Sequence, residues 1–329
     1  MTRVHIVGAA GYAAGELIRL LEPHPHFELG ALESASHAGQ PIAAHMPLLR
    51  RLERAFDPPG TAAAIARAGD AVVLAGGAES ARQAAPAFLA AGLRVVDLSD
   101  AFRLHAHAGE AVYGFPERHR AAIAGARLVA NPGCYPTATL LALLPLAPFA
   151  NDIVQLIVDA KSGITGAGRT PATPSMFAEL DGDVRAYGLD GHRHQPEIEQ
   201  ELAAAGITAP LVFTPHVVPL RRGMLADAYA VFARDLNAAD DAALADAYRQ
   251  AYDGSPFVRL LPSERTPSLL AVAGSNDAEL HLSRRGRVVR ILCALDNLGK
   301  GAAGEALQNL NIMYGYPEEC GLNDRVIVV

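Results

Sequence analysis

Cys134 is the residue whose setting in the sequence most strongly suggests chemistry. It lies in the segment NPGCYPTAT (131–139), between apolar runs at 126–130 and 138–146 that predict a short buried strand and a helix. At the start of a helix, unpaired backbone N–H groups and the helix dipole stabilise a negative charge, and a thiolate is the nucleophile of sulfur chemistry. The alternative is a small buried side chain, and the position alone leaves both interpretations open.

The histidines supply a candidate proton carrier for such a nucleophile, because the pKa of histidine lies near neutrality. Twelve are present, and His192 and His194 stand out because they precede a predicted helix beside Arg193 and Glu197. A zinc site needs more ligands than one His-x-His pair, so no metal is expected. Near a nicotinamide, a thiolate would form a thioester from an activated acyl group, and hydride transfer would release an aldehyde.

A glycine-rich turn near the N-terminus is a candidate dinucleotide site. Residues 4–7 predict a strand, residues 16–21 predict a helix, and the turn GAAGYAAG (8–15) joins them. Its spacing is G-x-x-G-x-x-x-G, whereas the commonest fingerprint is G-x-G-x-x-G. The alternative is a simple connecting turn, but the strand–turn–helix context favours a pyrophosphate resting on the helix N-terminus. The candidate cofactor-binding residues here are Gly8, Ala10, Gly11, Tyr12 and Ala13.

The loop after the second predicted strand (27–32) should meet the adenosine ribose of this cofactor. Ser34 and Ser36 suit a 2′-phosphate, whereas Glu33 suits a free 2′-hydroxyl, and the loop contains no arginine. His37 could act as a partial cation, or it is a solvated loop residue. NADP(H) and NAD(H) both stay open at this loop.

Further apolar strands at 71–75, 93–98 and 128–130 alternate with helical sequence. This alternation predicts an α/β domain with a Rossmann-type, doubly wound parallel sheet. Two prolines just before residue 149 predict the end of this domain.

The remainder of the chain favours a second domain of a different class. Its predicted strands lie at 153–160, 211–213, 224–232, 268–272 and 288–294, and its predicted helices at 195–205, 240–252 and 301–313, the last with one apolar face. Alternating and β-branched patterns favour an α+β domain with a mostly antiparallel sheet. We expect residues 1–148 and 300–329 to form the dinucleotide-binding domain, and residues 149–299 to form the substrate and oligomerisation domain.

One loop of the second domain could hold an anionic substrate. The segment KSGITGAGRT (161–170) combines two cations with hydroxyl groups and three glycines. The alternative is a flexible surface loop, since glycine-rich loops are common.

Composition excludes several classes of protein. The chain has 329 residues, of which 50% are hydrophobic, and a net charge of −7 with no basic run, which argues against a nucleic-acid partner or an anionic membrane surface. No apolar run is long enough to span a membrane. Three cysteines do not make a disulfide framework, and Cys293 and Cys320 are expected to be packing residues. We expect a soluble, cytoplasmic protein.

Together these motifs resemble the N-acetyl-γ-glutamyl-phosphate reductase family, which is related to the aspartate-semialdehyde dehydrogenases. The resemblance covers essentially the whole chain, and its most specific part is the segment 131–137 around Cys134. The other matching motifs are VGAAGY with GEL (7–17), AKSG with GAGR (160–169), GHRH with PEI (191–198), TPH (214–216) with Pro219, and DNL with KG (296–301).

The resemblance implies reduction of N-acetyl-γ-glutamyl phosphate by NADPH, in arginine biosynthesis, to the semialdehyde and phosphate. Cys134 would carry the thioester, His192 would be the acid/base and Glu197 would orient its imidazole, because in this family the first histidine precedes the glutamate by five positions. His194 stays an alternative acid/base. The implied substrate-binding residues are Arg103, Asn131, Lys161, Ser162, Arg169, His194 and Arg222, and the implied cofactor-binding residues include Ser34, Ser36, Gly163 and Asn297. A homodimer or homotetramer is also implied.

The chain departs from the family pattern in three places. Ser34-Ala35-Ser36 replaces the usual Ser-Arg-Ser, which removes a cation from the 2′-phosphate position. The segment GGAE (76–79) replaces Leu-Pro-His-Gly, and the order of Asp100 and Ala101 is reversed. Two alternative functions are the same chemistry on an aminoadipyl phosphate of lysine biosynthesis and a dinucleotide-binding regulator without activity. The Asn-Pro pair before Gly133 favours the glutamyl substrate, and the retained nucleophile favours an active enzyme.

Overall fold

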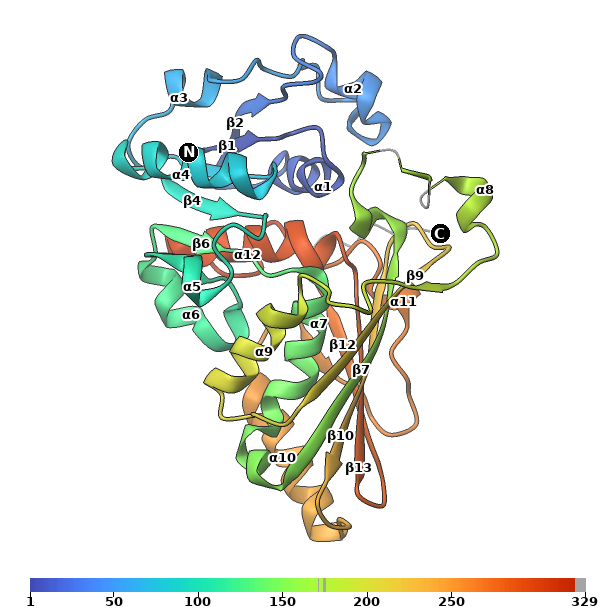
Figure 1. Ribbon diagram of the computed structural model, residues 1–329. Coiled ribbons are helices and arrows are strands. Elements are labelled where there is room, and N and C mark those ends of the chain that lie inside the picture. The colour runs from blue at the N-terminus through green and yellow to red at the C-terminus, as the bar shows by residue number, and fades with distance from the viewer. Residues whose placement is uncertain (171, 174–175, 323–329) are drawn as a thin grey trace. The chain divides into compact units, whose positions relative to one another are not determined.

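The computed structural model describes residues 1–170, 172–173 and 176–322, and the chain forms two compact units (Figure 1). The first runs from Met1 to Gly133 and includes the C-terminal segment from Ala302, and the second runs from Cys134 to Gly301. This division precedes the one expected near residue 149, because helix α7 (Cys134–Leu143) packs against strands of the second unit. In the described parts of the chain, no helix is long and apolar enough to cross a membrane.

The first unit contains a six-stranded parallel sheet in the order β2-β1-β3-β4-β6-β5. Its strands are β1 (Thr2–Val7), β2 (Phe27–Glu33), β3 (Ala71–Leu74), β4 (Arg94–Asp97), β5 (Val112–Tyr113) and β6 (Leu128–Ala130). Its helices are α1 (Tyr12–Leu21), α2 (Ile42–His45), η1 (Pro47–Leu49), α3 (Thr61–Ile65), α4 (Ala78–Ala90), α5 (His105–Ala108), α6 (Pro116–Gly125) and α12 (Gly304–Tyr314). Helices α3 and α4 pack on one face, and α1, α6 and α12 pack together on the other. The predicted doubly wound parallel sheet is therefore confirmed.

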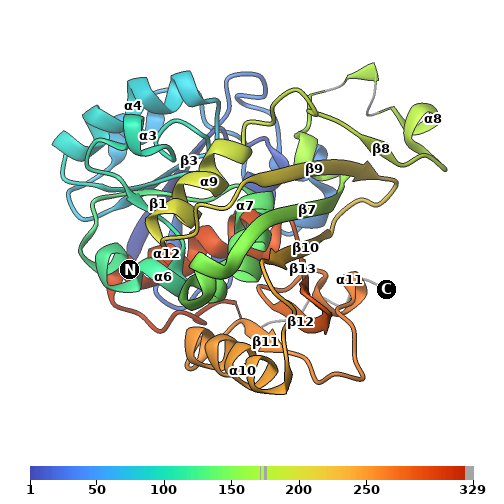
Figure 2. The ribbon, with the colours of Figure 1, turned by 60° about the horizontal axis from the view of Figure 1, so that its bottom comes forward.

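The second unit contains a seven-stranded sheet in the order β11-β12-β13-β10-β7-β9-β8 (Figure 2). Its strands are β7 (Ile153–Gly163), β8 (Arg185–Ala186), β9 (Leu211–Val218), β10 (Met224–Phe232), β11 (Val258–Leu260), β12 (Ala278–Arg285) and β13 (Val288–Leu295). Besides α7 it contains η2 (Leu144–Asp152), η3 (Ile164–Ala167), α8 (Phe177–Leu180), α9 (Gln195–Ala204), α10 (Ala238–Tyr252), α11 (Leu269–Val272) and the π-helical turn η5 (Gly299–Ala303). Four of the six neighbouring strand pairs are antiparallel, which confirms the predicted class of sheet.

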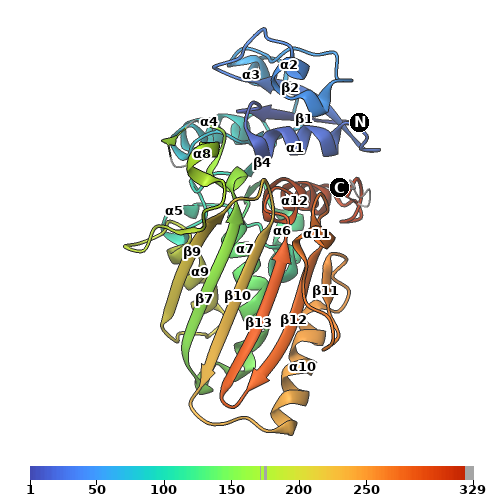
Figure 3. The same ribbon diagram turned by 90° about the vertical axis from the view of Figure 1, so that its right-hand side faces the viewer.

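Helices cover one face of this second sheet (Figure 3). Strand β10 alternates strictly between buried and half-exposed residues, as expected when only one face of a strand is covered. Helix α7 packs on β10 and β13, and all its residues after Cys134 are buried. The hydroxyl groups of Tyr248 and Tyr252, on α10, donate to carbonyl groups near the end of α7. The helix that begins with the candidate nucleophile is thus fixed along its length.

Two sequence predictions differ from the structure. Residues 268–272 were expected to form a strand, but Leu269–Val272 is the short helix α11, because a brief apolar run does not distinguish a strand from a helix. The outer neighbour of β13 is instead β12, which was not predicted because it contains many polar and charged residues. The last helix carries the expected apolar residues, and its polar residues are buried as well, since every residue from Gly304 to Met313 is buried.

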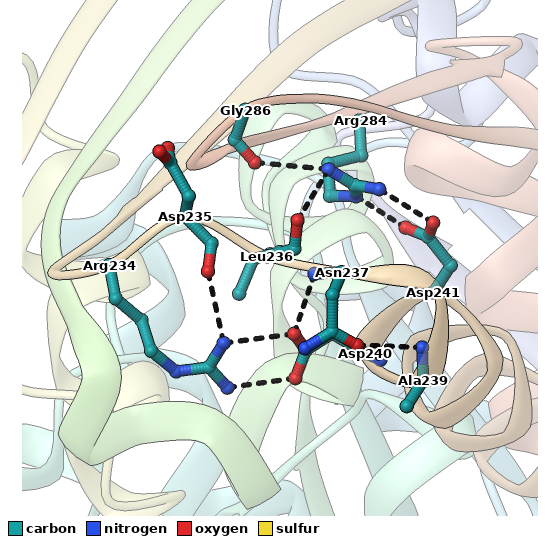
Figure 4. Close-up of polar contacts among 9 residues, drawn as sticks. All are labelled: Arg234, Asp235, Leu236, Asn237, Ala239, Asp240, Asp241, Arg284 and Gly286. Atoms are coloured by element: carbon teal, nitrogen blue, oxygen red, sulfur yellow. Dashed lines mark hydrogen bonds and ion pairs between the residues drawn. The ribbon is translucent and has the colours of Figure 1, made fainter.

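The start of α10 is fixed by a charged capping network (Figure 4). Asn237 accepts from the Asp240 backbone N–H at 3.4 Å, and the Asp240 carboxylate accepts from the Asn237 N–H at 2.8 Å, which is a capping box. Arg234 forms two bonds to Asp240 and lowers the pKa of that carboxyl group. Arg284, at the end of β12, binds both carboxylate oxygens of Asp241. This network joins the helix to the β12–β13 hairpin.

Candidate active site

Cys134 is the first residue of α7, is partly exposed, and forms no disulfide bond in the described structure. It therefore lies among the N-terminal N–H groups of a helix, as the sequence predicts. The backbone of η5 passes close to it, since a Cβ placed on Gly301 would lie 2.8 Å from the Cys134 Cβ. Glycine at position 301 thus leaves the space that the nucleophile needs.

A cleft of about 540 Å³ in the second unit opens onto Cys134. It brings together five of the predicted site residues, namely Cys134, Ser162, Gly163, His192 and His194. The other lining residues include Tyr135, Ile164, Arg185, Tyr187, Arg193 and Val217. A volume of this size accommodates a small metabolite, so the cleft is the candidate substrate site.

His192 is held in one tautomer. Its Nδ1 accepts the backbone N–H of His194 at 3.1 Å, so the proton of the neutral ring lies on Nε2. Burial, with a smaller contribution from the Arg193 charge, lowers the pKa of His192 to about 4. At neutral pH the ring is therefore uncharged, with its one N–H group on Nε2.

An aromatic cluster surrounds this imidazole. The Tyr187 hydroxyl donates to the Tyr135 hydroxyl at 3.2 Å, which in turn donates to the His216 carbonyl at 2.8 Å. The His192 ring lies 5.6 Å from the Tyr135 ring and 5.3 Å from the Tyr187 ring, both edge-to-face. Burial raises the pKa of both tyrosines. Neither tyrosine was predicted from the sequence to have a role, although Tyr135 directly follows the nucleophile.

The loop after β7 is packed rather than open. A Cβ on Gly163 would lie 2.9 Å from the backbone of Arg222, and one on Gly166 would lie 3.0 Å from the Ser162 Oγ. The Thr165 hydroxyl donates to the Arg221 carbonyl at 2.7 Å and accepts from the Asn297 side chain at 3.0 Å. These contacts place Ser162 and Gly163 against the cleft and explain two of the loop's three glycines.

The remaining predicted residues of the second unit lie outside the cleft lining. The Lys161 ammonium pairs with Asp159 at 3.0 Å, and the Arg222 guanidinium pairs with the fully buried Asp296 at 2.7 Å. Arg169 follows η3, and the Asn297 side chain accepts from the Gly223 N–H at 2.7 Å. Glu197 is buried in the first turn of α9. For these residues the predicted roles in binding and catalysis stay predictions.

In the first unit, the predicted cofactor turn joins β1 to α1. Gly8 has φ +90°, and a Cβ there would lie 2.8 Å from the carbonyl carbon of Ala75, so only glycine fits. Gly11 precedes α1, and no side chain caps the helix, so its first N–H groups face the turn formed with Ala10, Tyr12 and Ala13. Uncapped N–H groups at a helix start fit the pyrophosphate of a dinucleotide.

At the ribose loop, the Glu33 carboxylate is buried and accepts the Ala62 N–H at the start of α3, at 2.5 Å. It is therefore directed at a helix and not at the loop surface. Ser34 is buried and accepts the His37 N–H at 3.2 Å, whereas Ser36 is exposed and lies 2.7 Å from His37 Nδ1. Ser36 and His37 are the polar groups that this loop presents.

Arg103 and Asn131, both predicted to bind substrate, make internal contacts in the first unit. Arg103 donates to the carbonyls of Asn131 and Leu98, each at 2.8 Å. The Asn131 side chain is buried and bonds to Asn309 and Ala302. The structure thus shows these two residues holding the backbone just before Cys134.

Comparison with known proteins agrees with this arrangement. Residues 3–126 match the semialdehyde dehydrogenase NAD binding domain, and residues 134–297 match the semialdehyde dehydrogenase dimerisation domain. The N-acetyl-gamma-glutamyl-phosphate reductases of Geobacter metallireducens and Moorella thermoacetica are 42% and 40% identical to this chain, with 98% of both chains covered in each case. This chain belongs to the N-acetyl-gamma-glutamyl-phosphate reductase family. The resemblance seen in the sequence and the predicted oxidoreductase class are confirmed.

Solved structures show how widely this family's fold is shared. Aspartate semialdehyde dehydrogenase II complexed with ASA from Vibrio cholerae has a TM-score of 0.72 at 16% identity, with 96% of this chain and 98% of that chain covered. Aspartate semialdehyde dehydrogenase with NADP from Candida albicans has a TM-score of 0.70 at 16% identity, covering 95% and 98%. At such identity these structures establish the fold of this N-acetyl-gamma-glutamyl-phosphate reductase family member and nothing finer.

Proposed function

We propose that this chain reduces N-acetyl-γ-glutamyl phosphate with NADPH, giving N-acetylglutamate semialdehyde and phosphate for arginine biosynthesis. The observation that carries the proposal is the partly exposed Cys134 at the start of α7, in a cleft shared with His192. Relatives named for this activity match the chain over 98% of its length.

Cys134 is the nucleophile in this proposal. Its sulfur attacks the acyl carbonyl, the bond to phosphate breaks, and the thiol proton leaves with the phosphate, so a thioester remains on the enzyme. Bound at the first unit, the cofactor supplies the hydride that reduces this thioester. Hydride addition gives a tetrahedral adduct on Cys134. Its C–S bond then breaks to release the aldehyde and a Cys134 thiolate, and one proton from solvent restores the thiol.

His192 is the proposed donor to the reacting oxygen. The hydrogen bond to Nδ1 places the ring proton on Nε2. The neutral ring therefore offers one N–H donor without adding a charge to the cleft. A donor of this kind stabilises the negative oxygen that forms when sulfur or hydride adds to the carbonyl. His194 is more buried and lines the same cleft, so it is the second candidate.

The ribose loop supports NADP(H) over NAD(H). A carboxylate that binds the 2′-hydroxyl is the usual mark of an NAD site, and here Glu33 is bound to the start of α3. Ser36 and His37 can hydrogen-bond a 2′-phosphate in place of the absent arginine. The fold relative from Candida albicans was solved with NADP.

The second unit also supports self-association. It matches a dimerisation domain, and its helix layer covers one face of the sheet, while alternate residues of β10 on the other face are half-exposed (Figure 3). We propose a homo-oligomer built from dimers, in a reducing cytoplasm that keeps Cys134 as a thiol.

The test is the reverse reaction, followed as formation of NADPH from NADP⁺ with N-acetylglutamate semialdehyde and phosphate. Turnover should depend on phosphate. Without phosphate, NADPH formation should stop after about one equivalent per active site, because the thioester accumulates. NADP⁺ should exceed NAD⁺ in kcat/KM by about tenfold or more, the effect of one charge-assisted hydrogen bond to the 2′-phosphate. Cofactor binding without turnover would overturn the proposal, and a preference for an aminoadipate semialdehyde would overturn the substrate assignment.

A further inference from the structure

The backbone of Asn131, three residues before the nucleophile, is anchored by hydrogen bonds. The Asn131 N–H donates to the Asp97 carbonyl at 2.9 Å, which continues the pairing of β6 with β4. The Asn131 carbonyl accepts from Arg103 Nε at 2.8 Å. Both backbone groups of Asn131 are therefore satisfied before the chain turns toward Cys134.

The Asn131 side chain is also fully engaged. Its Oδ1 accepts from the Asn309 side chain at 3.0 Å, and its Nδ2 donates to the Ala302 carbonyl at 3.3 Å and the Pro132 carbonyl at 3.4 Å. A buried amide with these partners fixes a turn, because leaving any of them unpaired is costly. The side-chain oxygen and nitrogen of Asn131 thus bond to residues of the first unit.

Asn309 makes the decisive contact from α12. It is fully buried, and its Nδ2 donates to Asn131 and to the Gly114 carbonyl, at 3.0 and 2.8 Å. Gly114 follows β5, and a Cβ there would lie 2.7 Å from Asn309 Nδ2 and 2.6 Å from the Val129 side chain. The loop after β5 is therefore shaped around the Asn309 amide, which ties it to the turn after β6.

We propose that Asn309 is a positioning residue for the nucleophile, acting through Asn131 to set the path of the chain into Cys134. Asn309 lies 175 positions after Cys134 in the chain and does not line the cleft, so it acts on catalysis without touching substrate. The inference rests on the proposed function, in which the Cys134 sulfur must meet a carbonyl carbon at a defined angle. A displacement of about 1 Å at such a group lowers a rate by about a hundredfold.

The test compares Asn309→Ala with Asn311→Ala. Asn311 lies on the same helix, is equally buried, and donates to two carbonyls, those of Glu318 and Cys320, at 3.0 and 2.8 Å. Asn309→Ala loses one bond to a side-chain amide oxygen and one to a backbone carbonyl, and Asn311→Ala loses two to backbone carbonyls, so we expect a similar fall in Tm. Only Asn309→Ala should lower kcat, by about tenfold or more with KM little changed. Alkylation of Cys134 by iodoacetamide should slow in the same variant, which gives a readout independent of substrate.

A double variant tests the route through Asn131. If Asn309 acts through Asn131, then Asn131→Ala combined with Asn309→Ala is no slower than Asn131→Ala alone. Equal loss of kcat in Asn309→Ala and Asn311→Ala, or full additivity in the double variant, would overturn the proposal. An inactive wild-type protein would instead overturn the proposed function, and the alkylation comparison would still decide the positioning role.

Discussion

The chain contains two strand–turn–helix junctions for which we propose chemical roles, and they are built in opposite ways. The turn between β1 and α1 is defined by its own glycines, with Gly8 at φ +90° and no side chain capping the helix. The turn between β6 and α7 is defined by side chains from elsewhere in the chain, namely Arg103 and Asn309.

This difference follows from what each turn must do. A turn that binds a large exchangeable ligand must leave backbone N–H groups uncovered, so its requirement is the absence of side chains. A turn that holds a nucleophile must resist movement of one sulfur atom, so its requirement is a set of internal hydrogen bonds. The first requirement is local in sequence, and the second is distributed over the chain.

The largest expected effect separates the nucleophile from the cofactor turn. Cys134→Ser should reduce turnover by about a thousandfold or more, because a hydroxyl is a far weaker nucleophile than a thiolate. NADPH affinity, measured by fluorescence titration, should be unchanged. Cys320→Ser is the matched control, since Cys320 is also partly exposed, is in no disulfide bond and lies outside the cleft. Full activity in Cys134→Ser, or equal loss in both variants, would show that the nucleophile has been misplaced.

The same contrast explains how far the sequence predicts the site. Cys134, His192 and Gly8 were predicted as site residues from short local patterns, because a strand, a turn and a helix start are encoded by neighbouring residues. The partners of Asn131 were not found, because Asn309 has no unusual setting in the sequence and its role depends on α12 joining the first unit. Strand β12 was missed for a related reason, since its pairing with β13 outweighs its own polar pattern.

The next largest effect tests the glycine turn itself, by comparing Gly8→Ala with Gly11→Ala. At Gly8 the added Cβ meets the Ala75 backbone and φ is positive, so we expect a loss of about 1–3 kcal/mol in the free energy of unfolding. At Gly11 φ is −77° and the nearest atom to an added Cβ is 3.9 Å away, so the fold should be unaffected.

Gly11→Ala is therefore the sharper probe of the cofactor. We expect it to weaken NADPH binding by about tenfold, because the added methyl group occupies the space of the pyrophosphate. Thermal unfolding checks that the fold is intact, and cofactor titration measures the affinity. Unchanged affinity in Gly11→Ala would mean that this turn does not approach the cofactor, and the contrast between the two junctions would fail.

The smallest expected effect concerns the electrostatics of the cleft. The pKa of His192 is lowered to about 4, so the neutral ring is retained as the pH falls from 7 toward 4, and the acid limb of kcat/KM should lie well below pH 6.5. Arg193→Gln removes a positive charge that opposes protonation, so the pKa of His192 should rise and the limb should move to higher pH. Because burial is the larger cause, the shift should be less than about one unit.

Arg185→Gln is the control, because it also removes a cation from the cleft lining. Arg185 pairs with Asp183 at 2.7 Å and is not among the causes of the lowered His192 pKa. The acid limb of this variant should therefore stay where it is in the wild-type protein. A limb near pH 6.5 in the wild-type protein would show that the active imidazole is a solvated one, and His192 would lose its assigned role.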